Sequence, residues 1–344
     1  MKRICLLFIT VIFISCTRCT NFHDEKAPEY VSVMSFNTEN LCDGTHQGTE
    51  YAQFDPDSGS WTEKDYRARL LQLSRTIKEA GEKVPDIIAF QEIENQGVLK
   101  ELTKGYLSGC GYKYIVISSN SDSAIQSGFI SRYPYDYVRY HTPYLSAYGN
   151  QREIIEAAFN IHGHRLIIFN NHWKSKLGDE TEMQRLFSAD TLSARISAIM
   201  EQHPKAEILL LGDFNECADE YIRTGKKAAT AIMPADSQKK AIYQSIYITG
   251  DANNRDSRIF FSPWLTEQHT GTGSYFYRSS WETIDNFFLN SNLTDNDGFC
   301  FRNFRTVQTQ WNTNSDGYPM SFNKKTATGC SDHFPILLEL NLKD

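Results

Sequence analysis

Carboxylate, amide and imidazole side chains recur at one kind of position in this chain, next to short apolar segments. These groups belong to Asn37, Glu39, Glu92, His172, Asp213, Asn215, Asp285, Asp332 and His333. Oxygen donors of this kind suit Mg²⁺ or Mn²⁺, whereas zinc sites favour thiolates and clustered histidines. Because Mg²⁺ needs only one or two carboxylates from a protein, the sequence predicts a site at Glu92 with Glu39 or Asp332 beside it.

The apolar segments beside these groups are too short to be core helices. They are runs of about four to six largely β-branched or aromatic residues, typical of buried β-strands. The runs cover 31–36, 86–91, 166–169, 208–211, 284–289 and 336–340. Ligands of α/β proteins gather at strand ends, so we expect the polar side chains to converge.

Helical patterns separate the predicted strands. The first begins at the capping-box pair Thr62 and Asp65 and stops at Gly81, and the second covers 182–202. The spacing of strands and helices is too uneven for a barrel of repeated βα units, and it favours two packed sheets with helices outside. Between 217 and 250 the pattern is weak, and 224–227 are expected in an exposed loop.

The N-terminus is typical of a targeting segment. Lys2 and Arg3 precede the apolar run 4–14, which is too short to span a bilayer at roughly 17–25 residues. We therefore expect a signal peptide at 1–15, lipidation of Cys16, a tether at 16–28 and one domain at 29–344. The expected location is extracytoplasmic, on a bacterial membrane as a lipoprotein; the alternative is a plain signal peptide and secretion. Six cysteines follow Cys16, and their pairing stays open.

The charge of the chain restricts its partners. The net charge of −7 becomes −9 once Lys2 and Arg3 are removed with the signal peptide. This argues against tight, sequence-independent binding of long duplexes, which depends on Lys and Arg. A local basic rim is compatible with an acidic whole, and its candidates are Arg152, Lys174, Lys176 and Arg185.

Four motifs occur in the order and spacing of the endonuclease/exonuclease/phosphatase superfamily, and the chain resembles its members. They are SFN at 35–37, AFQE at 89–92, GDFN at 212–215 and SDHFP at 331–335. The segment HWKSK at 172–176 is most similar to secreted bacterial nucleases. The resemblance implies a DNase I-like four-layer α/β sandwich, in which two mixed β-sheets pack face to face with helices outside. It also implies Mg²⁺-dependent hydrolysis of phosphate esters, with Mn²⁺ as a substitute.

The resemblance also implies a role for each site residue. The metal ligands would be Glu92, Glu39 and Asp332. The catalytic residues would be His172, Asp213, Asn215, Asp285 and His333, with Asp213 activating water and Asp285 orienting His333. The phosphate would contact Asn37, Arg152, Asn171 and Lys174.

Several alternatives stay open at this point. A single Glu after a strand is ordinarily a solvated carboxylate, and an Asp after Gly ordinarily closes a turn. The ordered set of four motifs favours a site. We expect a monomeric nuclease acting on extracellular DNA or RNA. The competing substrates are phosphate monoesters, phospholipids and inositol phosphates, and a non-catalytic binding module is the remaining class.

Overall fold

The computed structural model describes residues 29–120, 123–176, 178, 181–237, 244–269 and 271–343. The expected signal peptide, Cys16 and the tether lie outside these residues. Within them, no helix is long and apolar enough to cross a membrane. The five cysteines described are free thiols: Cys42, Cys110, Cys217, Cys300 and Cys330. No disulfide joins these five in the described part of the chain.

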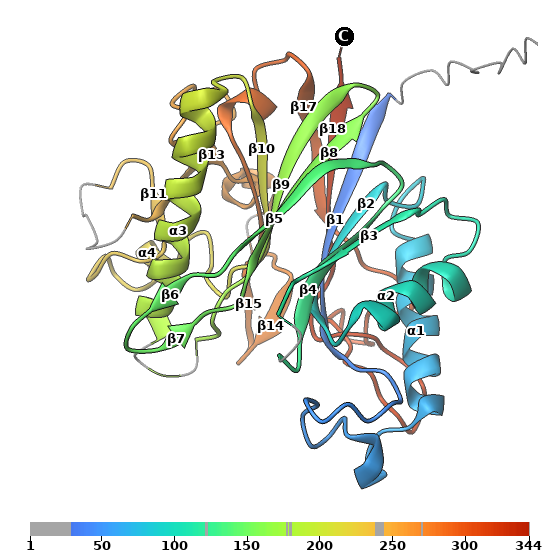
Figure 1. Cartoon of the computed structure of the whole chain (residues 1–344). Coiled ribbons are helices and arrows are strands. Elements are labelled where there is room, and N and C mark those ends of the chain that lie inside the picture. The colour runs from blue at the N-terminus through green and yellow to red at the C-terminus, as the bar shows by residue number, and fades with distance from the viewer. Residues whose placement is uncertain are drawn as a thin grey trace, which may run out of the picture.

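Two mixed β-sheets form the centre of the molecule (Figure 1). The six-stranded sheet has the order β17 (Phe299–Thr306), β18 (Ile336–Leu342), β1 (Tyr30–Leu41), β2 (Ile87–Ile93), β4 (Gln126–Ser131) and β3 (Tyr114–Ile117). The eight-stranded sheet has the order β11 (Ile232–Pro234), β12 (Ile246–Thr249), β13 (Ile259–Phe261), β16 (Asp285–Leu289), β10 (Glu207–Asp213), β9 (His164–His172), β8 (Ile154–Ile161) and β5 (Tyr135–His141). Two small hairpins flank the sheets: β6 (Tyr144–Leu145) with β7 (Gly149–Asn150), and β14 (Tyr275–Tyr277) with β15 (Ser280–Glu282).

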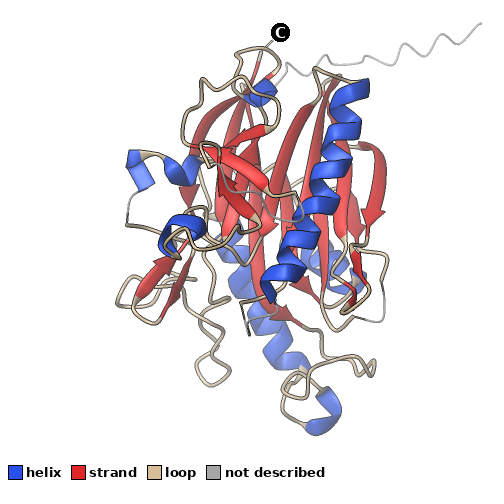
Figure 2. Ribbon diagram, turned by 90° about the vertical axis from the view of Figure 1, so that its left-hand side faces the viewer, coloured by secondary structure: helices blue, strands red, loops and turns tan. Residues whose placement is uncertain are grey.

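Helices cover the outer faces of both sheets (Figures 1 and 2). The helices are α1 (Glu63–Lys78), α2 (Gln96–Glu101), α3 (Thr181–Gln202) and the short α4 (Glu220–Arg223). Figure 1 places α1 and α2 on the side of the six-stranded sheet and α3 on the side of the eight-stranded sheet. The expected four-layer sandwich is confirmed.

The helices and strands predicted from the sequence are present in the structure, but some of them end at other residues than predicted. Helix α1 has the expected capping box at Thr62 and Asp65, but it ends at Lys78, three residues before Gly81. Strand β1 continues five residues past the predicted end at Phe36. The weakly patterned segment after Cys217 holds α4, β11 and β12, and residues 224–227 are exposed as expected.

The two sheets meet through a dense apolar core. Val31, Val33 and Ile87 of the six-stranded sheet share one buried cluster with strands β8, β9 and β10. Phe129 of β4 packs edge-to-face on Phe159 of β8, with ring centroids 5.4 Å apart. Burial of such rings contributes strongly to stability and keeps the sheets at a definite separation.

Candidate active site

Strands β1 and β2 are parallel, and a bulge at their carboxyl ends brings Glu39 beside Glu92. Asn37 pairs with Gln91 and Leu41 with Ile93, so three residues of β1 lie opposite Glu92 alone. Glu39, Asn40 and Glu92 have φ angles of 52°, 57° and 63°, in the left-handed region. Such backbone costs about 1–3 kcal/mol per residue and persists only where its surroundings hold it. The Asn40 N–H donates to Glu92 Oε2 at 2.8 Å.

Arg69 of α1 holds the backbone of this bulge. Its buried guanidinium donates to the carbonyl oxygens of Thr38 and Glu39, each at 2.5 Å, and of Asn40 at 3.0 Å. It also donates to the carbonyl oxygen of Cys330, three residues before His333. A single side chain therefore fastens two segments of the site to each other. The sequence signal was an arginine on the apolar face of α1, three residues after Tyr66.

Replacing this guanidinium should destabilise the protein. We expect Arg69→Lys to lower the free energy of unfolding by about 2–4 kcal/mol, because one ammonium cannot satisfy all of these buried carbonyl groups. Chemical denaturation measures the change. Arg67→Lys is the matched control, since Arg67 is exposed and pairs only with Glu63 on the helix surface. Equal stability of the two variants would contradict the role given to Arg69.

The strand register of the second sheet aligns three more groups. Asp213 at the end of β10 pairs with His172 of β9 on one side and with Asp285 of β16 on the other. Asn37 joins the two sheets here, because its Nδ2 donates to Asp213 Oδ2 at 2.9 Å and to Glu92 Oε1 at 3.3 Å. The predicted phosphate-side amide thus orients two carboxylates, one from each sheet.

Asp213 is held by its neighbours on several sides. The Asn215 backbone N–H donates to Asp213 Oδ1 at 2.8 Å, and Asn215 Nδ2 donates to Asp213 Oδ2 at 3.1 Å. Asn215 has a φ of 50°, and Gly212 a φ of 126°; a Cβ at Gly212 would overlap the Asn171 carbonyl oxygen. Burial, reinforced by Asp285, raises the pKa of Asp213 to about 7.

His333 and Asp285 form a buried hydrogen-bonded pair. His333 Nδ1 lies 2.7 Å from Asp285 Oδ2, which also accepts from Ser274 Oγ at 2.6 Å. Burial alone would lower the pKa of His333, but the Asp285 carboxylate raises it well above the ordinary value. The ring of Tyr275 packs on His333 with centroids 4.7 Å apart. His333 can therefore present a protonated Nε2 to a substrate oxygen.

His172, expected among the catalytic residues, lies at the end of β9 against Arg152. Arg152 Nη1 lies 2.7 Å from His172 Nε2 and also donates to the Trp173 carbonyl oxygen at 2.8 Å. Since arginine is always a donor, His172 Nε2 accepts. Burial first, then the charges of Arg152 and His333, lower the pKa of His172 well below its ordinary value. Arg152 thus carries the positive charge on this side of the site.

The predicted metal ligands lie at the bulge. Glu39 Oε2 accepts from the Asp332 backbone N–H at 3.1 Å, and Glu92 Oε1 lies 3.5 Å from His172 Nε2. Burial, followed by the charge of Asp332, raises the pKa of Glu39 to about 7. Carboxylates placed together in this way repel one another, and a divalent cation relieves that repulsion. The donor set, all oxygen, fits Mg²⁺ or Mn²⁺.

Two tighter groups occur among the described residues. Asp213, Asp285 and His333 bring one ligand atom each within 4.8 Å of one another, and so do His46, Asp55 and Asp57. In the first group, His333 Nδ1 is already paired with Asp285. We therefore assign this group to proton transfer and charge stabilisation and not to metal binding. The second group lies in a partly exposed loop. The set Glu39, Glu92 and Asp332 is less compact, as expected for an ion that keeps water and substrate ligands.

The phosphate-binding role predicted for Asn171 is not supported. Its Nδ2 donates to the carbonyl oxygens of Phe169 and Leu211, and its Oδ1 accepts from Trp173 Nε1 at 3.1 Å. These contacts follow from strand alternation, because Asn171 points to the face opposite His172. Lys174 is exposed just beyond β9, and its backbone carbonyl accepts from Arg185.

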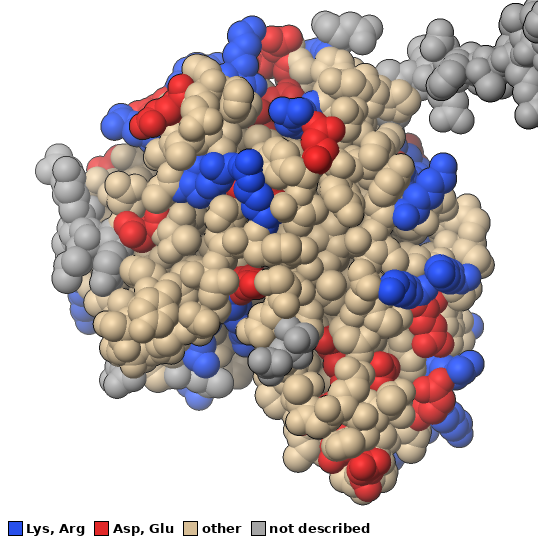
Figure 3. Space-filling model, viewed as in Figure 1, with Lys and Arg blue, Asp and Glu red and all other residues tan. Residues whose placement is uncertain are grey.

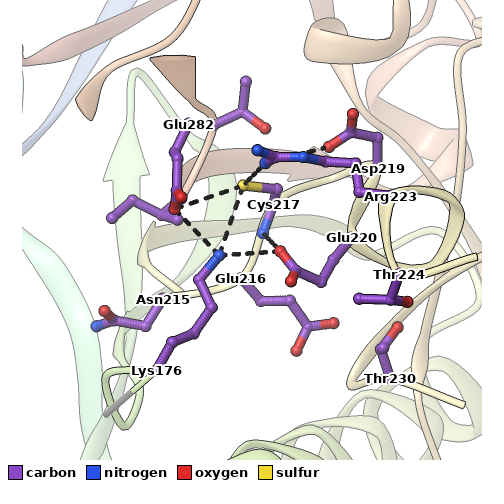
Figure 4. Close-up of polar contacts among 12 residues, drawn as sticks. Lys176, Asn215, Glu216, Cys217, Asp219, Glu220, Arg223, Thr224, Thr230 and Glu282 are labelled. Atoms are coloured by element: carbon purple, nitrogen blue, oxygen red, sulfur yellow. Dashed lines mark hydrogen bonds and ion pairs between the residues drawn. The ribbon is translucent and has the colours of Figure 1, made fainter. Parts of the chain in front are cut away.

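The predicted basic rim loses two of its four members. Lys176 Nζ lies between Glu220 and Glu282, at 2.9 and 3.0 Å, with Cys217 beside it (Figure 4). Arg185 is buried and pairs with Glu182 and Glu216. Arg152 and Lys174 remain. On the face shown in Figure 3, Lys and Arg occur in separate groups, with Asp and Glu among them.

Other supporting residues were not anticipated. Ser331 Oγ donates to the Asn37 carbonyl oxygen at 2.7 Å and accepts from the His333 N–H at 3.0 Å. Trp264 Nε1 donates to the Asp285 carbonyl oxygen at 2.8 Å. Ser331 lies inside the SDHFP motif, and its place in that motif could have indicated its role. Ser274 lies in a segment without a pattern, and Trp264 ends an aromatic run at 260–264.

Comparison with models of protein families identifies the family of this chain. The model of the Endonuclease/Exonuclease/phosphatase family matches residues 32–342. The chain belongs to this family. Its members are phosphoesterases that are generally dependent on divalent metals, and the carboxylates of Glu39, Glu92 and Asp332 are present here. A search of curated proteins finds no match.

Solved structures of family members have the same fold. TDP2 from C. elegans is 15% identical, with a TM-score of 0.56, and the match covers 92% of this chain and 77% of that one. A mannosyl-6-phosphatase of Bacteroides thetaiotaomicron VPI-5482 is 15% identical, with a TM-score of 0.52 and coverage of 90% and 99%. The human Nocturnin catalytic domain with bound sulfate is 14% identical, with a TM-score of 0.53 and coverage of 92% and 95%.

Proposed function

We propose that the protein is a divalent-metal-dependent phosphodiesterase that cleaves DNA or RNA outside the cytoplasm. One observation carries the hydrolase proposal: Glu92, Asn37 and Asp213 form one hydrogen-bonded chain across the two sheets. The nucleic-acid substrate is supported by the HWKSK segment and by the D. rerio TDP2 structure, which is a complex with a single-stranded DNA product.

The residues would share the work of hydrolysis as follows. Glu92 and Glu39, with Asp332 nearby, would hold Mg²⁺ or Mn²⁺, which supplies positive charge for the phosphate oxygens. Asp213, once ionised, would accept the proton of the attacking water. Protonated His333, charged and oriented by Asp285, would donate to a phosphate oxygen as negative charge develops.

The remaining residues would bind and orient. Arg152 would contact the phosphate from the side of His172, and Lys174 would contribute a charge at the rim. Asn37 and Asn215 keep Asp213 in a single orientation, so that the carboxylate is placed before substrate arrives. Asn171 takes no part, because its hydrogen bonds are made elsewhere.

A phosphomonoesterase is the second candidate. The pairing of Lys176 and Arg185 with glutamates leaves few cations for a polynucleotide backbone. A structural neighbour is named as a mannosyl-6-phosphatase.

We further propose the arrangement expected from the N-terminus. Residues 1–15 would be removed as a signal peptide, Cys16 would carry the lipid anchor, and 29–344 would form the catalytic domain. The protein would then be a monomeric lipoprotein at the periplasmic or outer cell surface.

Metal dependence is testable without a known substrate. We expect Mg²⁺ at about 100 times its Kd to raise the free energy of unfolding by about 2.7 kcal/mol, and EDTA to reverse the change. Thermal unfolding of the purified protein measures it. Mn²⁺ should act similarly, and K⁺ at equal ionic strength is the control. No stabilisation by either divalent ion would contradict the metal site.

The substrate is tested on the same preparation. Single- and double-stranded DNA, RNA, mannose 6-phosphate, inositol phosphates and sphingomyelin are offered with Mg²⁺, with Mn²⁺ and with EDTA. Metal-dependent cleavage of a polynucleotide supports the nuclease proposal. Turnover confined to a monoester or a lipid favours the alternatives. A folded, metal-binding protein without turnover would support a binding module.

A further inference from the structure

A cavity of about 180 Å³ opens beside Glu39, at the edge of the candidate site. Its other lining residues are Gln53, Phe54, Trp61, Arg69, Phe322 and Lys324. Three of the seven are aromatic, and they come from the loop after β1 and from the segment before Asp332. The roles assigned above to metal and phosphate ligands leave this cavity unexplained.

The aromatic rings form a preorganised wall. Trp61 packs edge-to-face against Phe54 at 5.3 Å between centroids and against Phe322 at 6.0 Å. Trp61 is 2% exposed, and its Nε1 donates to the Cys42 carbonyl oxygen at 3.2 Å. Phe54 and Phe322 are only half-buried. The cavity therefore has a fixed floor and two partly exposed rings, which suits contact with another ring.

The two cationic side chains at the cavity differ in how much of their hydrogen-bonding capacity is used within the protein. The guanidinium of Arg69 donates to backbone carbonyls of the bulge. Lys324 Nζ donates to the Ser60 carbonyl oxygen, a neutral acceptor, and its side chain is exposed. An ammonium has three donors. Lys324 can thus also donate to an oxygen on a ligand that enters the cavity.

The size of the cavity and its position restrict the occupant. The cavity of about 180 Å³ is close to the roughly 150 Å³ that holds one benzene ring, and its mixed aromatic and charged lining suits a six-membered ring with polar substituents. Because Glu39 lines both the cavity and the metal site, the occupant would be continuous with the phosphate ester. We propose that this cavity binds a nucleobase of pyrimidine size, carried by the phosphate ester that the site hydrolyses. The inference rests on the proposed hydrolase function.

Matched substrates test the subsite. Cytidine 5′-monophosphate is compared with ribose 5-phosphate, and a thymidine dinucleotide with the same molecule in which a tetrahydrofuran ring replaces one nucleoside sugar and its base. Base–aromatic contacts predict a kcat/KM about tenfold higher for the member that carries the base, in whichever pair is hydrolysed. Phe322→Ala should raise KM about tenfold for that member only. Lys324→Gln should act in the same direction to a smaller extent.

Controls separate this effect from misfolding. Tyr51→Ala removes an exposed aromatic side chain of the same loop that does not line the cavity, and it should change neither rate. Thermal unfolding checks each variant. If Phe322→Ala is unfolded, Phe322→Leu and Lys324→Gln carry the test, because they are milder changes at a half-buried and an exposed position.

The outcomes distinguish the subsite from the function. Equal rates for both members of a pair, unchanged by Phe322→Ala, would overturn the subsite while hydrolysis leaves the proposed function standing. If no substrate is hydrolysed, the proposed function fails and binding decides the subsite. Saturation-transfer NMR with cytidine 5′-monophosphate should then show contact to the base protons that Phe322→Ala removes. No such contact, or contact that survives the substitution, would overturn the proposal.

Discussion

Glu92→Gln is expected to lower kcat/KM by about three orders of magnitude, or ~4 kcal/mol, while the protein stays folded. The amide keeps the shape of the side chain and can still accept from the Asn40 N–H. It loses the negative charge that attracts a divalent cation. Steady-state kinetics over a Mg²⁺ titration measure both the rate and the apparent metal affinity, and both should fall.

The chain offers a closely matched control two residues further on. Glu94 is buried whereas Glu92 is half-buried; the Glu94 Oε2 accepts from the Asp43 N–H at 2.6 Å, and burial raises the pKa of Glu94 to about 7. A neutral amide is therefore tolerated there, and Glu94→Gln should keep activity within about twofold, since it touches none of the site residues. If Glu92→Gln kept a tenth of the wild-type rate with unchanged Mg²⁺ dependence, the assignment of Glu92 would be wrong.

Asp285→Asn is expected to reduce kcat by about 10²- to 10³-fold and to shift the pH profile. Asp285 raises the pKa of His333, so the wild-type enzyme keeps a protonated imidazole into alkaline solution. Without the carboxylate that pKa falls, and the alkaline limb of the kcat profile moves to lower pH. Ser274→Ala removes only one hydrogen bond to the same carboxylate, so its effects should be smaller and in the same direction.

The same pair makes folding stability depend on pH. A histidine whose pKa is raised on folding stabilises the protein fully below its unfolded-state pKa of about 6.5, and this stabilisation is lost as pH rises through the folded-state pKa. The difference in free energy of unfolding between wild type and Asp285→Asn should therefore shrink in alkaline solution. A difference that grows with pH, or an unmoved alkaline limb, would contradict the proposed pairing.

The sequence anticipated the residues that follow regular strands. His172 and Asp213 lie side by side because β9 and β10 are parallel and end at the same edge of their sheet, and their pairing follows from that register. Glu92 lies at the end of β2 of the other sheet, and Asn37 links it to Asp213. Asn171 was expected to contact the phosphate, although strand alternation places it on the face opposite His172.

Contacts between distant segments could not be anticipated. Lys176 was expected at a basic rim, but Glu220 and Glu282 neutralise it from segments 44 and 106 residues further along the chain. The bulge that carries Glu39 depends on Arg69, whose carbonyl partners come from β1 and from the segment before Asp332. Local patterns carry no information on such pairings, because tertiary packing decides them.

The division of the site between two sheets has a consequence for how its rate can change. Glu92 and Asp213 approach each other only as closely as the core between the sheets allows, and the contact of Phe129 with Phe159 is part of that spacer. Because protein interiors are close-packed, an added methylene there forces shifts of neighbouring side chains and backbone. The residues of the core between the sheets therefore affect the distance between the catalytic groups. Natural variation at these positions can change the turnover rate while every reacting group stays the same.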